Sequence, residues 1–349
     1  MDDLARAAIA RVDTAGELDL ILELPSHLRD ALWRVESAGL RRLDAPGGLV
    51  VAGMGGSAIG GVLARAALGD RASRPIGWAR DYGLPSWATG QAMVLCASYS
   101  GETEETLAAY EAAGAVGAPR IVVSSGGRLA AQARKDQVPI IPVPGGMRAS
   151  RAVGYMMVAA LEVAALCGAG DGLRAEIDVA AAQAEELLDE WGPEGDPENL
   201  AKSLARDLHG TAPVIAGAGL TVPIAYRWKS EINISAKVPS FANELPELDH
   251  NEVVGWDGAL ERGSFSFVAL DDSDLHPRVR ARMALTLKLI SEQSSGCYRV
   301  ETRGETRTAR VISLVVLGDL VALYLAVLRG VNPSASPAIE RLRRELASA

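Results

Sequence analysis

Two segments rich in glycine and hydroxyl groups have the composition of an anion-binding site. The first, residues 53–61, contains Gly56 and Ser57, and the second, residues 98–106, contains Ser98, Ser100 and Thr103. Glycines let the backbone approach a ligand closely, helix N-termini favour negative charge, and hydroxyl groups complete a cup around phosphate. These residue types therefore predict a phosphorylated ligand that is held without a metal ion.

Both segments are expected at the same edge of one sheet. Apolar runs at 48–52 and 92–97 precede them and are typical of buried parallel strands, and helical patterns follow them. In open α/β folds, ligands bind at the carboxyl ends of the strands. The two segments are therefore predicted to form one site.

Each segment alone also has a purely structural interpretation. The first could be a tight turn whose serine caps a helix, and Ser100 could cap the helix after the second. Glu102, Glu104 and Glu105 would favour that helix N-terminus, but they would repel a phosphate unless they face solvent. Four hydroxyl residues on neighbouring strand ends favour phosphate binding over these interpretations.

A dinucleotide site is a further alternative. Gly53, Gly55 and Ala58 match the Gly-x-Gly-x-x-Ala fingerprint, and Asp81 follows the next strand, where the pattern requires an acidic residue. This alternative leaves the hydroxyl groups of the second segment unexplained, so it is the least favoured of the three functions considered for this chain.

The pattern of the whole chain predicts an α/β fold with two doubly wound domains, each a parallel sheet flanked by helices. Strand-like runs alternate with Ala-rich helical segments in the first half. The strands are 48–53, 75–79, 92–98, 119–124 and 138–143, and the helices are 57–68, 103–113 and 127–135. This alternation is typical of a parallel sheet. A long helical stretch at 151–190 and a Pro/Gly-rich break at 191–198 follow.

The second half repeats the plan more weakly. Residues 213–219 echo the first glycine segment, but only Thr221 replaces its serine. Further strands are expected at 264–270 and 297–301, and helices at 222–236 and 277–295. We predict N-terminal helices at 1–45, a first domain with a linking helix at 46–190, and a second domain at 198–349.

Composition limits the partners and the compartment. The chain has 349 residues, 48% of them apolar, and a net charge of −9 without a basic tract, so nucleic acid and anionic membranes are poor partners. Three scattered cysteines, Cys96, Cys167 and Cys297, and a charged N-terminus predict a reducing, cytoplasmic location. The apolar run 311–328 contains Asp319 at its centre, so we predict a buried helix whose aspartate has a hydrogen-bonding partner.

At several motifs the chain resembles the bifunctional phosphoglucose/phosphomannose isomerases, which contain two sugar-isomerase (SIS) domains. The resemblance covers nearly the whole chain, and its carriers are residues 53–59, 98–106, 151–155 and 244–256. The last, Glu-Leu-Pro-Glu-Leu-Asp-His-Asn-Glu-Val-Val-Gly-Trp, is particularly specific. The resemblance implies that the protein interconverts aldose and ketose 6-phosphates through a cis-enediol, without a metal or nicotinamide cofactor.

The resemblance also implies roles for individual residues. Ser57, Ser98, Ser100 and Thr103, with Gly56, would hold the phosphate of glucose, mannose or fructose 6-phosphate. Arg151 would stabilise charge on the sugar oxygens. His250 would assist ring opening at a neighbouring subunit's site, which implies a homodimer.

The chain departs from the family pattern at the catalytic base. The family stretch Asn-Glu-Asn-Ala-Lys corresponds to 233–237 here, and Ile234 occupies the position of the base glutamate. Arg343 occupies the position of a family lysine, where it keeps the positive charge but cannot shuttle a proton. Glu231, one helical turn before Ile234, is a weak substitute that a solvated helix face explains equally well. A non-catalytic phosphosugar sensor or regulatory partner is therefore the alternative to an isomerase.

Overall fold

The chain divides into two compact units in a computed structural model that describes residues 3–346 and 348. The N-terminal unit comprises Glu23–Glu185 and Arg303–Ser313, and the C-terminal unit comprises the residues up to Leu22, Glu186–Thr302 and the residues from Leu314 onward. The predicted domain limits follow chain order, whereas these units are discontinuous, because the chain passes between them more than once.

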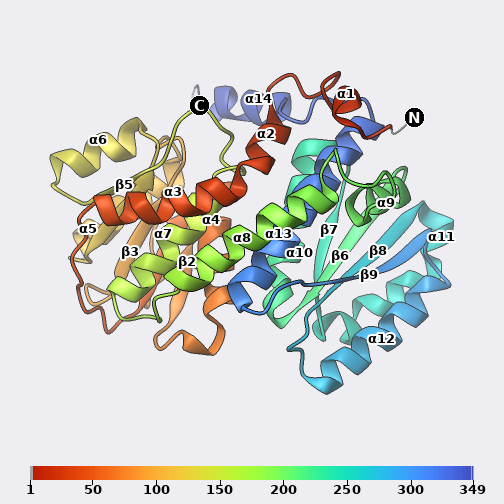
Figure 1. Cartoon of the computed structure of the whole chain (residues 1–349). Helices are drawn as coiled ribbons and strands as arrows, with labels where there is room; N and C mark the ends of the chain where they lie inside the picture. The colour runs from red at the N-terminus through yellow and green to blue at the C-terminus, as the bar shows by residue number, and fades with distance from the viewer. Residues whose placement is uncertain (1–2, 347, 349) are drawn as a thin grey trace. The chain divides into compact units, whose positions relative to one another are not determined.

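The N-terminal unit contains a five-stranded parallel sheet (Figure 1). Its order is β2-β1-β3-β4-β5, with bounds Ile76–Ala79, Leu49–Gly53, Met93–Ala97, Arg120–Ser124 and Ile140–Pro142. All four pairings are parallel, as predicted. In this strand order the switch point lies between β1 and β3. Both hydroxyl-rich segments directly follow these two strands, so the topology places them at the expected ligand edge.

The helices of the N-terminal unit bury both faces of that sheet. They are α3 (Leu24–Ser37), α4 (Gly55–Leu68), α5 (Glu104–Ala115), α6 (Gly127–Lys135), α7 (Val153–Leu166) and most of α8 (Arg174–Trp191). The stretch predicted as one long helix is two helices, α7 and α8. Helix α4 packs closely on α7, since a Cβ atom at Gly60 would lie 2.4 Å from that of Met156.

The C-terminal unit repeats the strand order with one strand fewer. Its parallel sheet runs β7-β6-β8-β9, with bounds Phe241–Leu245, Ala212–Ala218, Phe265–Asp271 and Gly296–Glu301. The sequence pattern did not predict β7, which is a partly exposed edge strand. Two sheets of the same order confirm the predicted fold class.

The C-terminal unit contains the helices nearest both chain ends and most of α13. Its helices are α1 (Arg6–Ile9), α2 (Glu17–Leu22), α9 (Leu200–Leu208), α10 (Val222–Glu231), α11 (Ala259–Arg262), α12 (Pro277–Ser291), α13 (Arg307–Leu328) and α14 (Pro337–Leu346). Helix α13 is long and apolar enough to span a membrane, but 89% of its most apolar window is buried. It is therefore a core helix, as predicted.

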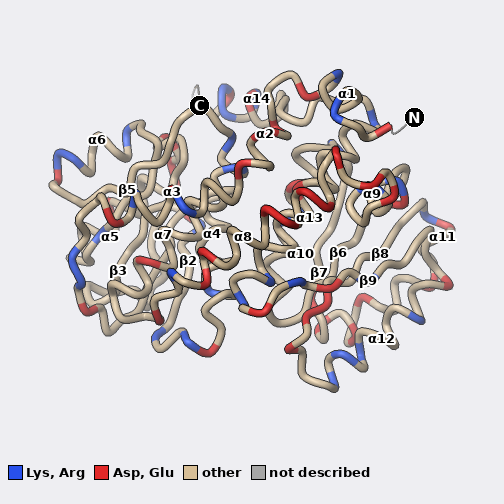
Figure 2. Tube along the Cα trace, in the orientation of Figure 1, with Lys and Arg blue, Asp and Glu red and all other residues tan. Residues whose placement is uncertain are grey.

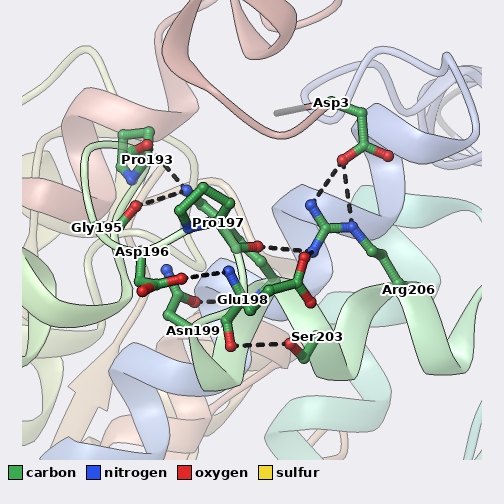
Figure 3. Close-up of polar contacts among 10 residues, drawn as sticks. Asp3, Pro193, Gly195, Asp196, Pro197, Glu198, Asn199, Ser203 and Arg206 are labelled. Carbon is green, nitrogen blue, oxygen red and sulfur yellow. Dashed lines mark hydrogen bonds and ion pairs between the residues drawn. The ribbon is translucent and has the colours of Figure 1, made fainter. Parts of the chain in front are cut away.

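The predicted break at 191–198 is a turn-rich segment, and Figure 3 shows the hydrogen bonds that Pro193, Gly195 and Asp196 make there. The ammonium group of Lys202 donates to the carbonyl oxygens of Pro193 and Gly195, at 3.0 and 3.1 Å. Asn199 caps α9 by accepting the backbone N–H of Lys202 at 3.0 Å. These contacts fix how the chain enters the second sheet. In Figure 2, acidic and basic residues are scattered over both units, and no described segment forms a continuous basic band.

Candidate functional site

The hydroxyl groups of the two segments form a connected cluster. The Ser98 hydroxyl donates to Oγ1 of Thr103 at 2.9 Å and accepts the Gly101 N–H at 3.1 Å. The backbone N–H of Tyr99 donates to Oγ of Ser57 at 3.0 Å, which joins the second segment to the first. Because Ser57 accepts this hydrogen bond, its own hydroxyl hydrogen stays available to donate to an anion.

The cluster lies partly inside the fold and partly at its surface. Ser57 and Ser98 are buried, Thr103 is half-buried and Ser100 is exposed. Ser57 is the third residue of α4, and Met54, not the serine, is the N-cap of that helix. Thr103, not Ser100, is the N-cap of α5, so the interpretation of Ser100 as a cap is wrong. Ser100 accepts the N–H of Glu102 instead, at 3.2 Å.

Glycines permit the close approach of backbone that brings Arg151 to the same edge. A Cβ atom at Gly53 would lie 2.5 Å from the carbonyl oxygen of Ala97, and one at Gly56 would lie 2.7 Å from the backbone of Ser150. Arg151 follows Ser150 directly and is 2% exposed, two residues before α7 begins. The predicted charge-stabilising arginine therefore belongs to the segment packed against the first glycine turn.

Two of the three glutamates in the second segment have hydrogen-bonding partners, and the partner of Glu102 is a cation that offsets its charge. Glu102 accepts the backbone N–H of Arg128 at 2.9 Å and its Nε–H at 2.7 Å. The Arg128 side chain thereby lowers the pKa of Glu102. Glu104 accepts the phenol hydroxyl of Tyr82 at 3.2 Å. The sequence showed that these glutamates would repel a phosphate, but it did not show which residues would bind their carboxylates.

Two residues that sequence reasoning missed also hold the second segment. The Tyr99 hydroxyl donates to the carbonyl oxygen of Pro144 and accepts the Met147 N–H, at 3.0 and 2.9 Å. Arg128 lies at the start of α6, just after the glycine pair 126–127. That pair of glycines follows β4, just as the first glycine segment follows β1. A third glycine-containing turn between a strand and a helix could therefore have drawn attention to Arg128 in the sequence.

In the C-terminal unit, Ile234 lies in a π-helical turn, Ile232–Ala236, and is half-buried. Lys237 ends the turn with φ = +56°, and its ammonium group contacts the carbonyl oxygen of Ile234 and, at 3.3 Å, that of Pro333. Arg329 donates to the carbonyl oxygens of Ala236 and, at 2.6 Å, of Lys237. π-Helical turns occur frequently at functional sites.

Glu231 does not lie on a solvated helix face. Its side chain is 3% exposed, and Oε1 lies 3.6 Å from NH1 of Arg227. Arg227 NH2 also donates to both carboxylate oxygens of Asp319 at 2.8 Å, which confirms the predicted partner for that aspartate. Glu231 is therefore a buried carboxylate paired with a guanidinium, which argues against it as a substitute for the predicted base.

His250 and Arg343 lie on separate exposed segments of the C-terminal unit. His250 ends a 3₁₀ turn, Glu247–His250, after β7. Its neighbour Asp249 accepts the Thr286 hydroxyl at 2.6 Å, which ties this turn to α12. Arg343 is exposed on α14, a helix without buried residues. No described contact joins either side chain to the turn at Ile234.

In the second glycine segment, the hydroxyl group of Thr221 already has hydrogen-bonding partners within its own unit. Thr221 is fully buried, and its hydroxyl accepts the Ala218 N–H at 2.8 Å and lies 2.6 Å from the carbonyl oxygen of Leu270. This threonine supports its own turn, so the hydroxyl cluster of the N-terminal unit is the better candidate site. Among residues 3–346 and 348, no group of three or more His, Cys, Asp and Glu side chains could hold a metal ion.

Comparison with known proteins identifies the family of the chain. Residues 197–346 match the family model of the bacterial phospho-glucose isomerase C-terminal SIS domain. A bifunctional phosphoglucose/phosphomannose isomerase from Caldicellulosiruptor bescii is 38% identical over 302 residues, which cover 86% of this chain and 89% of the relative. One from Aquifex aeolicus is 34% identical over 300 residues, with 86% and 90% covered.

A solved structure supports the fold independently. A glucose-6-phosphate isomerase like protein from Thermus thermophilus superimposes with a TM-score of 0.64 at 21% identity, covering 99% of both chains. With two parallel sheets of matching order and relatives of this similarity over most of its length, the chain belongs to the bifunctional phosphoglucose/phosphomannose isomerase family.

Proposed function

We propose that the protein binds a hexose 6-phosphate at the hydroxyl cluster and slowly interconverts its aldose and ketose forms through a cis-enediol, with water taking the C2 proton that Ile234 cannot accept. The observation that carries this proposal is the connected set Ser57, Ser98 and Thr103 at the switch point of the first sheet. A phosphate dianion suits hydroxyl donors and helix N-termini. The relatives' names supply the class of substrate, phosphoglucose and phosphomannose, and aldose–ketose isomerisation of either 6-phosphate gives fructose 6-phosphate.

The remaining steps of the proposal assign the other predicted residues. Arg151 stabilises negative charge on the sugar oxygens as the enediol forms. His250 assists ring opening from the neighbouring subunit of a homodimer, an arrangement that its exposed position permits. Arg343 contributes positive charge without transferring a proton. We also propose that the protein acts in the cytoplasm.

Binding is expected to depend on Ser57. Fructose 6-phosphate and mannose 6-phosphate should raise the melting temperature of the wild type, since a ligand at 100 times Kd stabilises a protein by about 2.7 kcal/mol. Ser57→Ala removes a hydrogen bond to a charged group, worth about 1.5–3 kcal/mol, so affinity should fall at least ~10-fold. Thermal denaturation measures the shift in melting temperature, and calorimetric titration measures the affinity.

The matched control is Ser73→Ala, because the Ser73 hydroxyl is exposed in the same unit and bonds only the Gly168 carbonyl oxygen in the described contacts. It should leave affinity unchanged. No thermal shift with any phosphosugar, in wild type and control alike, would remove the basis of the proposal.

Enediol chemistry is expected to appear as solvent exchange even when net turnover is slow. In D₂O, wild type should introduce deuterium at C1 of fructose 6-phosphate and at C2 of mannose 6-phosphate, because each enediol is reprotonated from solvent-exchangeable groups. Proton NMR of the sugar measures the loss of each signal. Boiled protein is the control and should exchange at the background rate, whereas Ser57→Ala should exchange at least ~10-fold more slowly than wild type when the sugar is well below its Kd.

A non-catalytic phosphosugar sensor is the second candidate function. The specific observation in its favour is Ile234, whose side chain has no proton to give or accept, together with the enclosure of Glu231 by Arg227. A sensor would bind the sugar phosphates with a thermal shift but would show no solvent exchange. The two measurements above therefore separate the candidates.

A further inference from the structure

Glu102 is a negatively charged residue within the segment that we propose binds a negatively charged phosphate. It is flanked by Gly101 and Thr103, and the Ser98 hydroxyl contacts both of these neighbours. A carboxylate beside a bound phosphate should weaken binding by like-charge repulsion. A second role must therefore offset that cost if the segment binds an anion.

The contacts of Glu102 indicate what that role is. Its two carboxylate oxygens accept the backbone N–H and the Nε–H of Arg128, so one side chain holds both the backbone and the guanidinium at the N-terminus of α6. The arginine returns a weaker contact, from NH2 to the carbonyl oxygen of Glu102 at 3.5 Å. A carboxylate at a helix N-terminus is stabilised by the free N–H groups there.

The backbone around this pair is packed without spare room. The Leu129 N–H donates to the carbonyl oxygen of Gly101 at 2.9 Å. A Cβ atom at Gly101 would lie 1.9 Å from the carbonyl oxygen of Gly126, and one at Gly127 would lie 2.3 Å from that of Ser100. The turn that presents Ser98, Ser100 and Thr103 is thus pressed against the start of α6. Ser125 donates to the Tyr99 carbonyl oxygen at 2.6 Å, and Glu102 is the charged side chain that ties the turn to the helix itself.

We propose that Glu102 is a positioning residue of the phosphosugar site. Its carboxylate binds Arg128 and the N-terminus of α6, and so fixes the turn from Ser98 to Thr103 in the shape that presents its hydroxyl groups. Arg128 cancels the negative charge that the turn would otherwise present to the phosphate. This inference rests on the proposed phosphate binding.

The direction of the effect of Glu102→Ala separates positioning from simple charge. If the carboxylate only repels phosphate, its removal should strengthen binding. If it positions the turn, its removal should weaken the binding of fructose 6-phosphate at least ~5-fold despite the lost repulsion. The melting temperature of the unliganded protein should change little, because the pair is largely exposed, with 52% and 63% of the two side chains accessible.

Two further variants make the test specific. Glu102→Gln keeps one oxygen that can accept the Arg128 N–H, so it should recover part of the lost affinity. Glu111→Gln removes an exposed charge further along α5 and should bind as wild type does. The dissociation constants come from isothermal titration calorimetry with fructose 6-phosphate.

Amide hydrogen exchange supplies a readout that does not need the ligand. In Glu102→Ala, the amides of residues 99–103 should exchange at least ~5-fold faster than in wild type, while those of β3 stay protected. Unchanged exchange, or affinity that stays level or rises in Glu102→Ala, overturns the positioning role. If wild type fails to bind any phosphosugar, the proposed function is lost, and the exchange rates alone still decide whether Glu102 holds the turn.

Discussion

Isomerase activity is expected to rise by ~10²–10⁴-fold when Ile234 is replaced by glutamate, which is the usual contribution of a positioned general base. The turn that carries residue 234 is already held at its end by Lys237 and Arg329. Ile234 is only half-buried, so a glutamate there does not require a carboxylate to enter a closed core. The measurement is kcat/KM for fructose 6-phosphate conversion in a coupled assay.

Ile234→Gln is the matched control, since it has the size and polarity of glutamate without a basic oxygen of suitable pKa. It should stay at the wild-type rate. Should wild type turn over at ordinary enzyme rates, with Ile234→Glu no faster, another base exists and the sensor is excluded. Should neither variant turn over while both bind the sugar, more than the base has been lost.

Strands that are buried on both faces were predictable from local sequence. The runs predicted for β1 and β3 agree with the structure to within one residue at each end. A short, continuous apolar run between helical segments is typical of a parallel strand that is buried on both faces. Strand β7, Phe-Ala-Asn-Glu-Leu, was missed. It pairs on one side only and contains exposed polar residues, so its hydrophobic signal is weak.

The hydroxyl residues were predictable for a related reason. Parallel topology alone brings the ends of β1 and β3 together, and the residue types after them indicate an anion. The partners of the charged residues were not predictable, because they are distant in sequence. Glu102 and Arg128 are 26 residues apart, and Arg227 and Asp319 are 92 apart. A lone aspartate in an apolar helix predicts that a partner exists, but not which residue it is.

Stability is expected to depend strongly on Arg227. Its side chain is 1% exposed and contacts two carboxylates, Asp319 at 2.8 Å and Glu231 at 3.6 Å, whose side chains are 5% and 3% exposed. Removing one partner of a buried ion pair typically costs ~3–5 kcal/mol, because an uncompensated charge stays behind. Arg227→Met leaves two carboxylates without this guanidinium, so the free energy of unfolding should fall by that amount in urea denaturation.

Asp319→Asn should cost less than Arg227→Met, because Glu231 remains beside the arginine as a counter-ion. Arg282→Met is the control for a pair whose arginine is partly exposed. Arg282 lies 3.5 Å from Asp249 with 43% of its side chain accessible, so its loss should cost under ~1 kcal/mol. Equal losses for Arg227→Met and Arg282→Met would mean that the buried cluster adds no more than a surface contact. In that case, Glu231 would not be held in place by Arg227, and its exclusion as the replacement base would lose its support.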